Sequence, residues 1–445
     1  MHPPGTAAGH RGPRNVVVTG LSAITPAGVG IEALWAALLE GRSFGARITA
    51  FDVSRNQSQV GAAADAFDPR AAGLSEDAIA RLDRSTMMAL ACARAAIDDA
   101  ELRSGTFRPA RVGVCIGSAI GGVDVMERAF RHACVAGGTD KPDRVMVRPD
   151  RVGRNIYGGF LAASISTEVA RDHGFTGPCT TMATGCTAGI DAIGTAAGMI
   201  ESGMADIVVT GGADAPLTPI VLTSFDNIRA ITRRNEQPSR ASRPFDRERD
   251  GFLLAEGSAI LVLEDEVLAR RRGARIYGRI LGFASTSNAH HMTGLPADGE
   301  ALACTISRAL ARAAVDADDV DYINAHGSST QQNDRNETGA FKRVFGKRAY
   351  RIPISSTKSC VGHALGAASA IEAAVCFLAL CRGVVPPTLN YETASPDCDL
   401  DYVPNAARDA RVRVILKNAS GFSGIHSATL FAHRDHAPRS RSEAA

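Results

Sequence analysis

Short β-branched runs that stop at a glycine and lead toward a helix recur along this chain. The first is residues 15–20 (NVVVTG), after which apolar residues repeat at helical spacing over 31–39. Similar patterns predict further strands at 111–117, 205–212, 260–263, 276–283, 322–325 and 352–355, and helices at 188–200 and 368–380. Strands that alternate with helices in this way predict an α/β fold.

The second part of the chain repeats the plan of the first. A Thr/Gly-rich turn at Cys186 leads into a helix, a glycine and the apolar run 207–210. The turn 359–366 likewise leads into a helix, Gly383 and the apolar pair Val384-Val385. The match is one of pattern rather than identity, and it predicts a duplicated α/β architecture.

The expected organisation is two similar halves packed as one body. Residues 15–272 form the half with Cys186, and residues 273–433 form the other. No internal Pro/Ser-rich segment is long enough to separate them as a flexible linker. Residues 1–14 and 434–445 are poor in apolar residues, and we expect them to be disordered tails.

Composition excludes several classes of protein. The 49 basic and 47 acidic residues leave a net charge of +2, too small for a field that attracts nucleic acid. Ten cysteines are too sparse for a disulfide scaffold and have no zinc spacing. No apolar run approaches membrane-spanning length, and the first fourteen residues lack an apolar export segment. We expect a cytoplasmic protein with free thiols, no metal and no membrane or nucleic-acid partner.

Cys186 stands on a tight turn before a helix, in the stretch TTMATGCTAGID at 180–191. The first turn of a helix presents unpaired N–H groups and the positive end of the dipole, which lower the pKa of a thiol and stabilise an oxyanion. The alternative is a buried structural cysteine, which suits most of the other nine. Small neighbours leave room for a substrate, and the local context alone leaves both interpretations open.

Two histidines occupy comparable turns. His326 directly follows the predicted strand 322–325, and His363 lies in the glycine-bracketed turn SCVGHALG at 359–366. A lone histidine is more often a satisfied polar residue than a catalyst. Three reactive side chains in three strand-to-helix turns, however, share one face of an α/β sheet. We therefore expect Cys186, His326 and His363 to converge.

Lys358 and Glu337 are two further candidates. Only five of the 49 basic residues are lysines, and Lys358 lies among small and apolar residues. A buried ammonium needs a carboxylate partner. We expect Lys358 to pair with Glu337, for which the alternative is plain surface charge.

Long stretches of the chain resemble the β-ketoacyl-carrier-protein synthases of the thiolase superfamily, and most closely the ketosynthase-alpha subunits of type II polyketide synthases. The resemblance runs from Val16 to about His433 and is carried by VVVTGLSAITPAG (16–28), ATGCTAGIDAIG (183–194), SRPFDRERDGFLLAEGSA (242–259), SNAHHMTGL (287–295), DYINAHGSSTQQNDRNET (321–338), SSTKSCVGHALGA (355–367), CDLDYVP (398–404) and SGFSGIHSA (420–428). It implies a thiolase-like, duplicated five-layered α-β-α-β-α architecture.

The resemblance also implies an acyltransferase activity and the parts played by particular residues. Cys186 would take an acyl chain from an acyl carrier protein as a thioester, with its own N–H and that of Phe422 as the oxyanion hole. His326 and His363 would hold the malonyl thioester carbonyl during loss of carbon dioxide. Further positions that match the family are the gate Phe422, the acyl-pocket residue Phe225, the pantetheine contacts Thr293, Ser328 and Thr330, and the carrier-protein contact Arg229. No bound cofactor is implied.

Three positions depart from the family pattern. Ser423 replaces a glycine after the gate phenylalanine, and Ser328 replaces a threonine. His426 stands where no histidine is expected. These changes concern gate motion and substrate preference rather than the core chemistry.

Several alternatives remain open at this point. The leading reading is a catalytic alpha subunit that pairs with a similar, cysteine-free chain-length subunit. A homodimeric fatty-acid elongation synthase shares its chemistry, and a non-catalytic chain-length subunit shares its fold. A thiolase would need a second cysteine in 421–424, and a papain-type protease would need a C-G-[SA]-C-[WY] motif. Both of these are absent.

Overall fold

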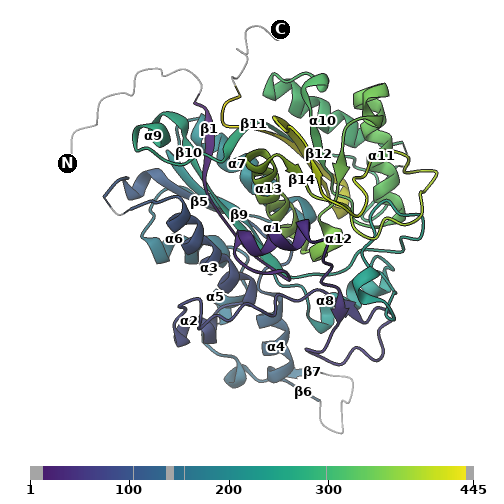
Figure 1. The fold of residues 1–445 in the computed structure, drawn as a ribbon. Coiled ribbons are helices and arrows are strands. Elements are labelled where there is room, and N and C mark those ends of the chain that lie inside the picture. The colour runs from purple at the N-terminus through teal and green to yellow at the C-terminus, as the bar shows by residue number, and fades with distance from the viewer. Residues whose placement is uncertain (1–13, 104, 137–144, 155, 297, 437–445) are drawn as a thin grey trace.

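Two five-stranded halves with the same strand order form the main sheet of the computed structural model (Figure 1). The structure describes residues 14–103, 105–136, 145–154, 156–296 and 298–436. The first half runs in the order β1 (Val16–Thr25), β10 (Gly257–Asp265), β9 (Ile207–Asp214), β5 (Val112–Gly117) and β8 (Cys179–Met182). The second half runs in the order β11 (Gly278–Ser287), β17 (Ile425–Ala432), β16 (Val414–Ser420), β12 (Tyr322–Asn324) and β13 (Ile354–Ser355).

The strand directions match as well, so the predicted duplication is confirmed. In each half the first three strands pair antiparallel and the last three pair parallel. Strands β1 and β11 pair from Val16↔Ile280 to Val18↔Gly278 and join the halves into one continuous path. The predicted counterpart of β9 was wrong, because Val384-Val385 forms β14 (Val384–Val385) in a separate two-stranded sheet with β15 (Arg408–Asp409). The true counterpart is β16, which the sequence pattern did not reveal.

Three layers of helices alternate with the two half-sheets, which gives the predicted five-layered order (Figure 1). Helices α7 (Ala188–Glu201) and α13 (Leu365–Arg382) pack against each other between the half-sheets. The outer faces are covered by α3 (Arg84–Asp99) and α6 (Ser164–His173) on one side, and by α10 (Glu300–Ala313) and α11 (Gln331–Phe345) on the other. Each half therefore repeats one βαβαβαββ plan.

The central helices approach so closely that only glycine fits at their contact. A Cβ atom on Gly189 would lie 2.7 Å from the carbonyl oxygen of Gly366 and 2.8 Å from the amide nitrogen of Ala370. Because Gly189 is near the start of α7 and Gly366 near the start of α13, this contact brings the two preceding turns together. Those turns carry Cys186 and His363.

Helix α13 is the most deeply buried element. Every residue from Leu365 to Leu380 is buried, as expected for a helix with sheet on both sides. Among the described residues it is the one helix long and apolar enough to cross a membrane, and 89% of that stretch is buried within the fold. Its apolar composition is therefore explained by its place in the core.

Shorter elements surround these layers. The helices are α1 (Ile31–Leu39), α2 (Glu76–Arg81), α4 (Val123–Ala133), α5 (Ile156–Phe160), α8 (Pro219–Asn227), α9 (Glu266–Arg271) and α12 (Lys358–Val361). The short strands are β2 (Gly28–Val29), β3 (Ala46–Arg47), β4 (Val60–Gly61), β6 (Cys134–Ala136) and β7 (Val145–Val147).

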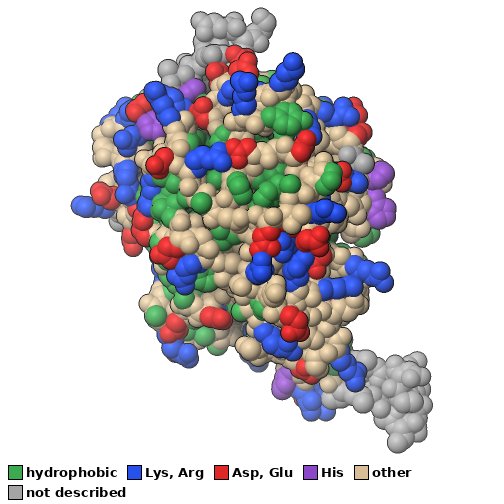
Figure 2. Space-filling view, turned by 45° about the vertical axis from the view of Figure 1, so that its right-hand side comes forward, with side chains coloured by type: hydrophobic (Ala, Val, Ile, Leu, Met, Phe, Trp, Pro, Cys, Tyr) green, Lys and Arg blue, Asp and Glu red, His purple; other side chains and the backbone are tan. Residues whose placement is uncertain are grey.

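The predicted tails fall mostly on residues 1–13 and 437–445, which lie outside the described residues. At their inner ends, Arg14 forms an ion pair with Asp206 at 2.8 Å, and His433 lies 3.4 Å from Asp435. Figure 2 shows basic and acidic side chains interspersed on one face, which agrees with the small net charge.

Candidate active site

Cys186 lies on the 3-10 turn Gly185–Thr187 between β8 and α7, where the sequence placed it. Gly185 has φ +65°, a left-handed conformation that glycine adopts without strain. The buried carboxylate of Asp191, one helical turn on, accepts hydrogen bonds from the hydroxyls of Thr184, Thr187 and Ser427. These bonds tie the turn both to its own helix and to β17 of the other half.

The two histidines lie beside each other. His326 follows β12, and His363 lies between α12 and α13, after β13. The centroids of their rings are 5.1 Å apart and the ring planes meet at 78°. The main chain of His363 is fixed by its bonds to Leu253 and Ala255, at 2.7 and 3.0 Å.

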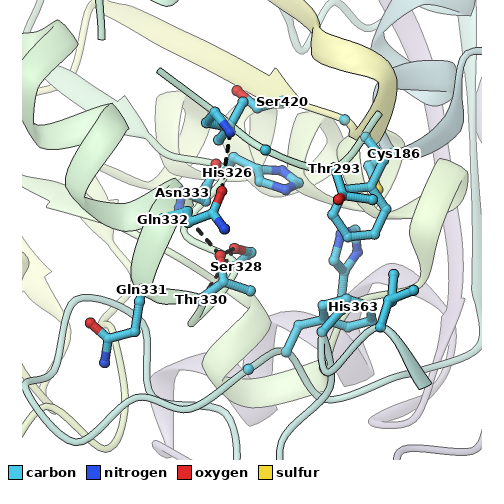
Figure 3. Close-up of a pocket in the computed structure, with 18 of the residues that line it drawn as sticks. Cys186, Thr293, His326, Ser328, Thr330, Gln331, Gln332, Asn333, His363 and Ser420 are labelled. Carbon is cyan, nitrogen blue, oxygen red and sulfur yellow. Dashed lines mark hydrogen bonds between the residues drawn. The ribbon is translucent and has the colours of Figure 1, made fainter. Parts of the chain in front are cut away.

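One cavity of about 230 Å³ brings the candidate residues together (Figure 3). Its wall includes Cys186, His326 and His363, which come from both halves of the fold. The other predicted residues in the wall are Phe422, Thr293, Ser328, Thr330 and Arg229. The predicted convergence of one thiol and two imidazoles on one cavity is therefore confirmed in the geometry.

The thiol of Cys186 differs from the expectation of a lowered pKa. Burial raises the pKa of Cys186 to about 11, although the positive charge of Lys358 and the backbone N–H groups of Phe422 and Cys186 favour the thiolate. The helix terminus favours the thiolate, but desolvation by the surrounding residues outweighs it. At neutral pH the group is therefore a thiol, so a nucleophilic step must remove its proton.

Both histidines are neutral at physiological pH. Burial holds the pKa of His326 well below its usual value, and Lys358, His363, Lys417 and His426 act in the same direction. Burial and the charges of Lys358 and Lys417 do the same for His363. A neutral imidazole can donate from one ring nitrogen and accept a proton at the other.

Glu337 fixes the turn that carries His326. Its two carboxylate oxygens accept four hydrogen bonds of 2.7 Å, from the amides of His326 and Gly327 and from the side chains of Asn333 and Asn418. The carboxylate is fully buried, so the alternative of plain surface charge is excluded. Glu337 holds the histidine through the main chain and does not line the cavity.

The expected pair between Lys358 and Glu337 was wrong. The ammonium of Lys358 pairs with Glu372, and it also donates to the main-chain carbonyl of His326 at 2.7 Å. The carboxylate of Glu337 cannot also accept a hydrogen bond from Lys358, because N–H groups of amides already occupy its four acceptor directions. Lys358 therefore lies behind the histidine pair with a different carboxylate.

Sequence reasoning missed Glu372, Lys417 and Asp214. Lys417 lies 2.8 Å from the second oxygen of Glu372. Asp214 accepts bonds from Ser118 at 2.6 Å and from the amide of Gly366 at 2.7 Å, at the start of α13. A signal existed for Glu372, since it is the one charged residue within the buried part of α13.

A group of aromatic rings closes the apolar side of the cavity. The ring of Phe225 lies 5.3 Å from Phe252 and 6.1 Å from Phe422, measured between centroids. Phe225 belongs to the apolar cluster that also contains Cys186, although it does not line the cavity. This position suits the acyl-pocket assignment, which remains a prediction.

The loop of Phe422 shows why a glycine is expected at Ser423. Ser423 has φ +68°, in the left-handed region that favours glycine. The main-chain N–H of Asn288 donates to the carbonyl oxygen of Gly424 at 2.9 Å. A Cβ on Gly421 would lie 3.5 Å from the main-chain nitrogen of Cys186. The gate loop therefore lies directly against the cysteine turn.

His426 is a buried residue of β17 beside this loop. Its Nδ1 forms a hydrogen bond with the hydroxyl of Ser420 at 2.9 Å, and its Nε2 lies 3.4 Å from the side-chain nitrogen of Asn288. Burial lowers the pKa of His426 to about 4. The unexpected histidine therefore supports the wall of the cavity and is neutral.

The remaining predicted contacts also line the cavity. The hydroxyls of Ser328 and Thr330 bond each other at 2.9 Å, and Thr330 caps α11. Arg229 is exposed, next to Ile228, which is 50% exposed. Among the described residues, no cluster of His, Cys, Asp and Glu could hold a metal ion.

A duplicated five-layered fold with one cysteine and two neutral histidines around a single cavity defines a condensing enzyme of the acyltransferase class. Residues 13–269 match the N-terminal domain of the beta-ketoacyl synthases and residues 277–392 match their C-terminal domain. The chain belongs to the beta-ketoacyl synthase family.

Curated relatives place the chain more narrowly. It is 46% identical, over 94% of its length and 97% of the relative, to the tetracenomycin polyketide synthase ketoacyl synthase alpha subunit of Streptomyces glaucescens. It is 40% identical, over 94% and 97%, to the 3-oxoacyl-[acyl-carrier-protein] synthase 2 of Synechocystis sp..

Solved structures agree with this placement. A type II polyketide synthase acyl carrier protein in complex with its ketosynthase bound to the hexaketide (AntDE:AntF) matches with a TM-score of 0.87 and 39% identity, over 95% of this chain and 100% of that one. The ishigamide ketosynthase/chain length factor matches with a TM-score of 0.84 and 32% identity, over 95% and 99%.

Proposed function

We propose that this chain is the catalytic ketosynthase of a type II polyketide synthase, which condenses malonyl-carrier protein with an acyl chain held on Cys186. The observation that carries the proposal is the shared cavity of Cys186, His326 and His363, with both rings neutral. A thiol holds one reactant, and two neutral rings are suited to bind a developing negative charge on the other.

The first step is transfer of the acyl chain. The sulfur of Cys186 attacks the thioester carbonyl of the acyl-carrier protein while its proton passes to a neutral imidazole. The amides of Cys186 and Phe422, which already act on the sulfur, hold the oxyanion. The carbon–sulfur bond to the carrier then breaks, and the pantetheine thiolate leaves with the proton.

The second step makes the carbon–carbon bond. Hydrogen bonds from His326 and His363 hold the thioester oxygen of malonyl-carrier protein, so that loss of carbon dioxide leaves its electron pair as an enolate. The enolate carbon attacks the acyl carbonyl on Cys186, and the carbon–sulfur bond breaks. The cysteine leaves as a thiolate and takes up a proton from solvent.

An exposed edge of the fold supports pairing with a second subunit. Strand β8 ends the sheet path and carries the cysteine turn. Helices α4 and α5 contact each other, and α6 connects them to β8. Met126 and Phe130 on α4 and Tyr157 on α5 are 48%, 57% and 68% exposed. A contiguous exposed apolar patch marks an interface, and we propose that these side chains belong to one whose occupant is a chain-length-factor-like subunit.

Greater identity to the polyketide subunit than to the 3-oxoacyl synthase favours a heterodimer over a homodimeric fatty-acid enzyme. A non-catalytic chain-length subunit would not need Cys186 in a cavity with two histidines. We further propose a cytoplasmic enzyme without a bound cofactor, whose substrates arrive on the phosphopantetheine arm of an acyl carrier protein. Thr293, Ser328 and Thr330 would contact that arm, and Arg229 would contact the acidic carrier.

Reconstitution tests the proposed function. The chain is co-expressed with its genomic neighbours and the purified complex receives malonyl-carrier protein. Mass spectrometry of the carrier then follows carbon dioxide loss and chain growth. We expect elongated β-keto acyl groups with the wild-type chain and none with Cys186→Ala. An elongated product from Cys186→Ala, or none from the wild-type complex, would contradict the proposal.

A further inference from the structure

Lys417 is a second buried lysine behind the cavity. The chain has five lysines among 49 basic residues, and two of the five, Lys358 and Lys417, flank the single carboxylate of Glu372. The side chains of Lys358, Lys417 and Glu372 are 1%, 0% and 2% exposed. Burying an ammonium is costly unless it is paired, so the second lysine needs a physical reason.

Lys417 is connected to His326 in two ways, through strand β12 and through Glu337. It pairs with Asn324 in the register between β16 and β12, two residues before His326. Its ammonium donates to the carbonyl of Asn418 and lies 3.4 Å from that of Asn324. The side chain of Asn418 in turn donates to Glu337, which holds the amide of His326.

The buried charges behind the histidines balance only when Lys417 is counted. Asn333 links Glu337 to Asp334, and Asp334 lies 3.6 Å from Arg249. The connected carboxylates are Glu372, Glu337 and Asp334, and the connected cations are Lys358, Lys417 and Arg249. Without Lys417 this network has one carboxylate without a cation.

We propose that Lys417 is a positioning residue of this site, which balances the buried carboxylates behind the two histidines and keeps Lys358 bonded to the carbonyl of His326. The proposal rests on the proposed function for its kinetic test only. An uncompensated buried carboxylate favours protonation of the nearest base. The charged or titratable groups that act on His326 are Lys358, His363, Lys417 and His426, and those that act on His363 are Lys358 and Lys417.

Three variants of the full chain in its complex test this inference. Lys417→Met removes the charge and keeps the length of the side chain. Lys417→Met combined with Glu372→Gln removes one charge of each sign, which restores the balance. Lys342→Met is the matched control, because Lys342 pairs with Asp399 on the surface, outside the site.

Two readouts separate a failure of this inference from a failure of the proposed function. NMR titration of the histidine rings, with His326 and His363 assigned by alanine variants, requires no activity. The pH profile of condensation requires it. If the wild-type complex does not condense, the proposed function fails and the titration still decides the part played by Lys417.

For Lys417→Met we expect the titration midpoint of His326 to rise by about one pH unit toward its usual value, and condensation to lose more of its rate at pH 6 than at pH 8. The double variant and the Lys342→Met control should both titrate with the wild-type midpoint of His326. A wild-type midpoint in Lys417→Met overturns the inference, as does a double variant that remains shifted. If the single variant does not fold, a folded double variant supports the inference and an unfolded one overturns it.

Discussion

The ammonium of Lys358 donates to the main-chain carbonyl of His326 at 2.7 Å while its charge is taken up by Glu372. The lysine therefore acts on the active site through the backbone and through its field, since it does not line the cavity. The active site therefore depends on the buried charges of Lys358 and Glu372 as well as on the three reactive side chains around the cavity.

Removal of that charge should change the reactivity of Cys186. Lys358 gives the largest contribution that lowers the pKa of the thiol, against burial, which raises the pKa to about 11. For Lys358→Met we expect the pKa to rise further and alkylation by iodoacetamide at pH 8 to slow about three- to tenfold. Peptide mass spectrometry follows Cys186 among the ten cysteines. Equal alkylation rates in the variant and the wild type would show that Lys358 does not act on the sulfur.

Glu337→Gln should disturb the turn of His326. The carboxylate accepts four hydrogen bonds, whereas an amide has one acceptor oxygen and presents an NH₂ group to other donors. We expect the free energy of unfolding to fall by about 2–4 kcal/mol, because buried donors lose their acceptor. Urea denaturation measures this loss, with the exposed Glu300→Gln on α10 as the control. A change in the Glu337 variant no larger than in the control would contradict the assigned hydrogen bonds.

The buried histidine of β17 should make stability depend on pH. The pKa of His426 is about 4 in the fold, below its usual value near 6.5. The unfolded chain therefore binds a proton that the folded chain does not, and stability rises with pH through this window. Below pH 6.5 the histidine should destabilise the fold progressively, by about 3 kcal/mol at pH 4. We expect His426→Gln to reduce the slope of unfolding free energy between pH 6.5 and 4, and an unchanged slope would exclude His426 as its source.

The gate loop offers a test of backbone strain. Ser423 has φ +68°, which costs a residue with a side chain about 1–2 kcal/mol. Glycine removes this cost but gains freedom in the unfolded chain, so Ser423→Gly should leave the free energy of unfolding within about 1 kcal/mol of the wild type. Ser423→Val should lower it by more, because a branched side chain is poorly accommodated in the left-handed region. A glycine variant less stable than the valine variant would contradict the strained conformation.

Much of the architecture could be predicted because the relevant signals are local. The strand-like residues before His326 form β12, and the helices predicted after Cys186 and His363 at 188–200 and 368–380 correspond to α7 and α13. The second half-sheet was harder. The counterpart of β9 was predicted at Val384-Val385, directly after the helix, but the equivalent strand is β16, which follows the separate β14–β15 pair, and local pattern does not reveal that insertion.

The site was predicted in its residues and only partly in its energetics. Three strand-to-helix turns on one face were enough to bring Cys186 and both histidines together. The partner of Lys358 and the raised pKa of Cys186 depend on burial and on contacts between segments distant in sequence, which a single sequence does not contain. Lys417 was missed for the same reason, since its neighbour Asn324 belongs to a strand far from it in the chain.

Peptide mapping of the acylated enzyme tests the central claim most directly. The wild-type complex and the His326→Ala variant each receive an acyl-carrier protein, and then malonyl-carrier protein. The account predicts that the acyl mass appears on the peptide with Cys186 in both proteins. Malonyl-carrier protein should then remove that mass only from the wild type, as it is transferred to an elongated product. An acyl group on any other residue, or equal turnover of the acyl-Cys186 peptide in both proteins, would contradict the account.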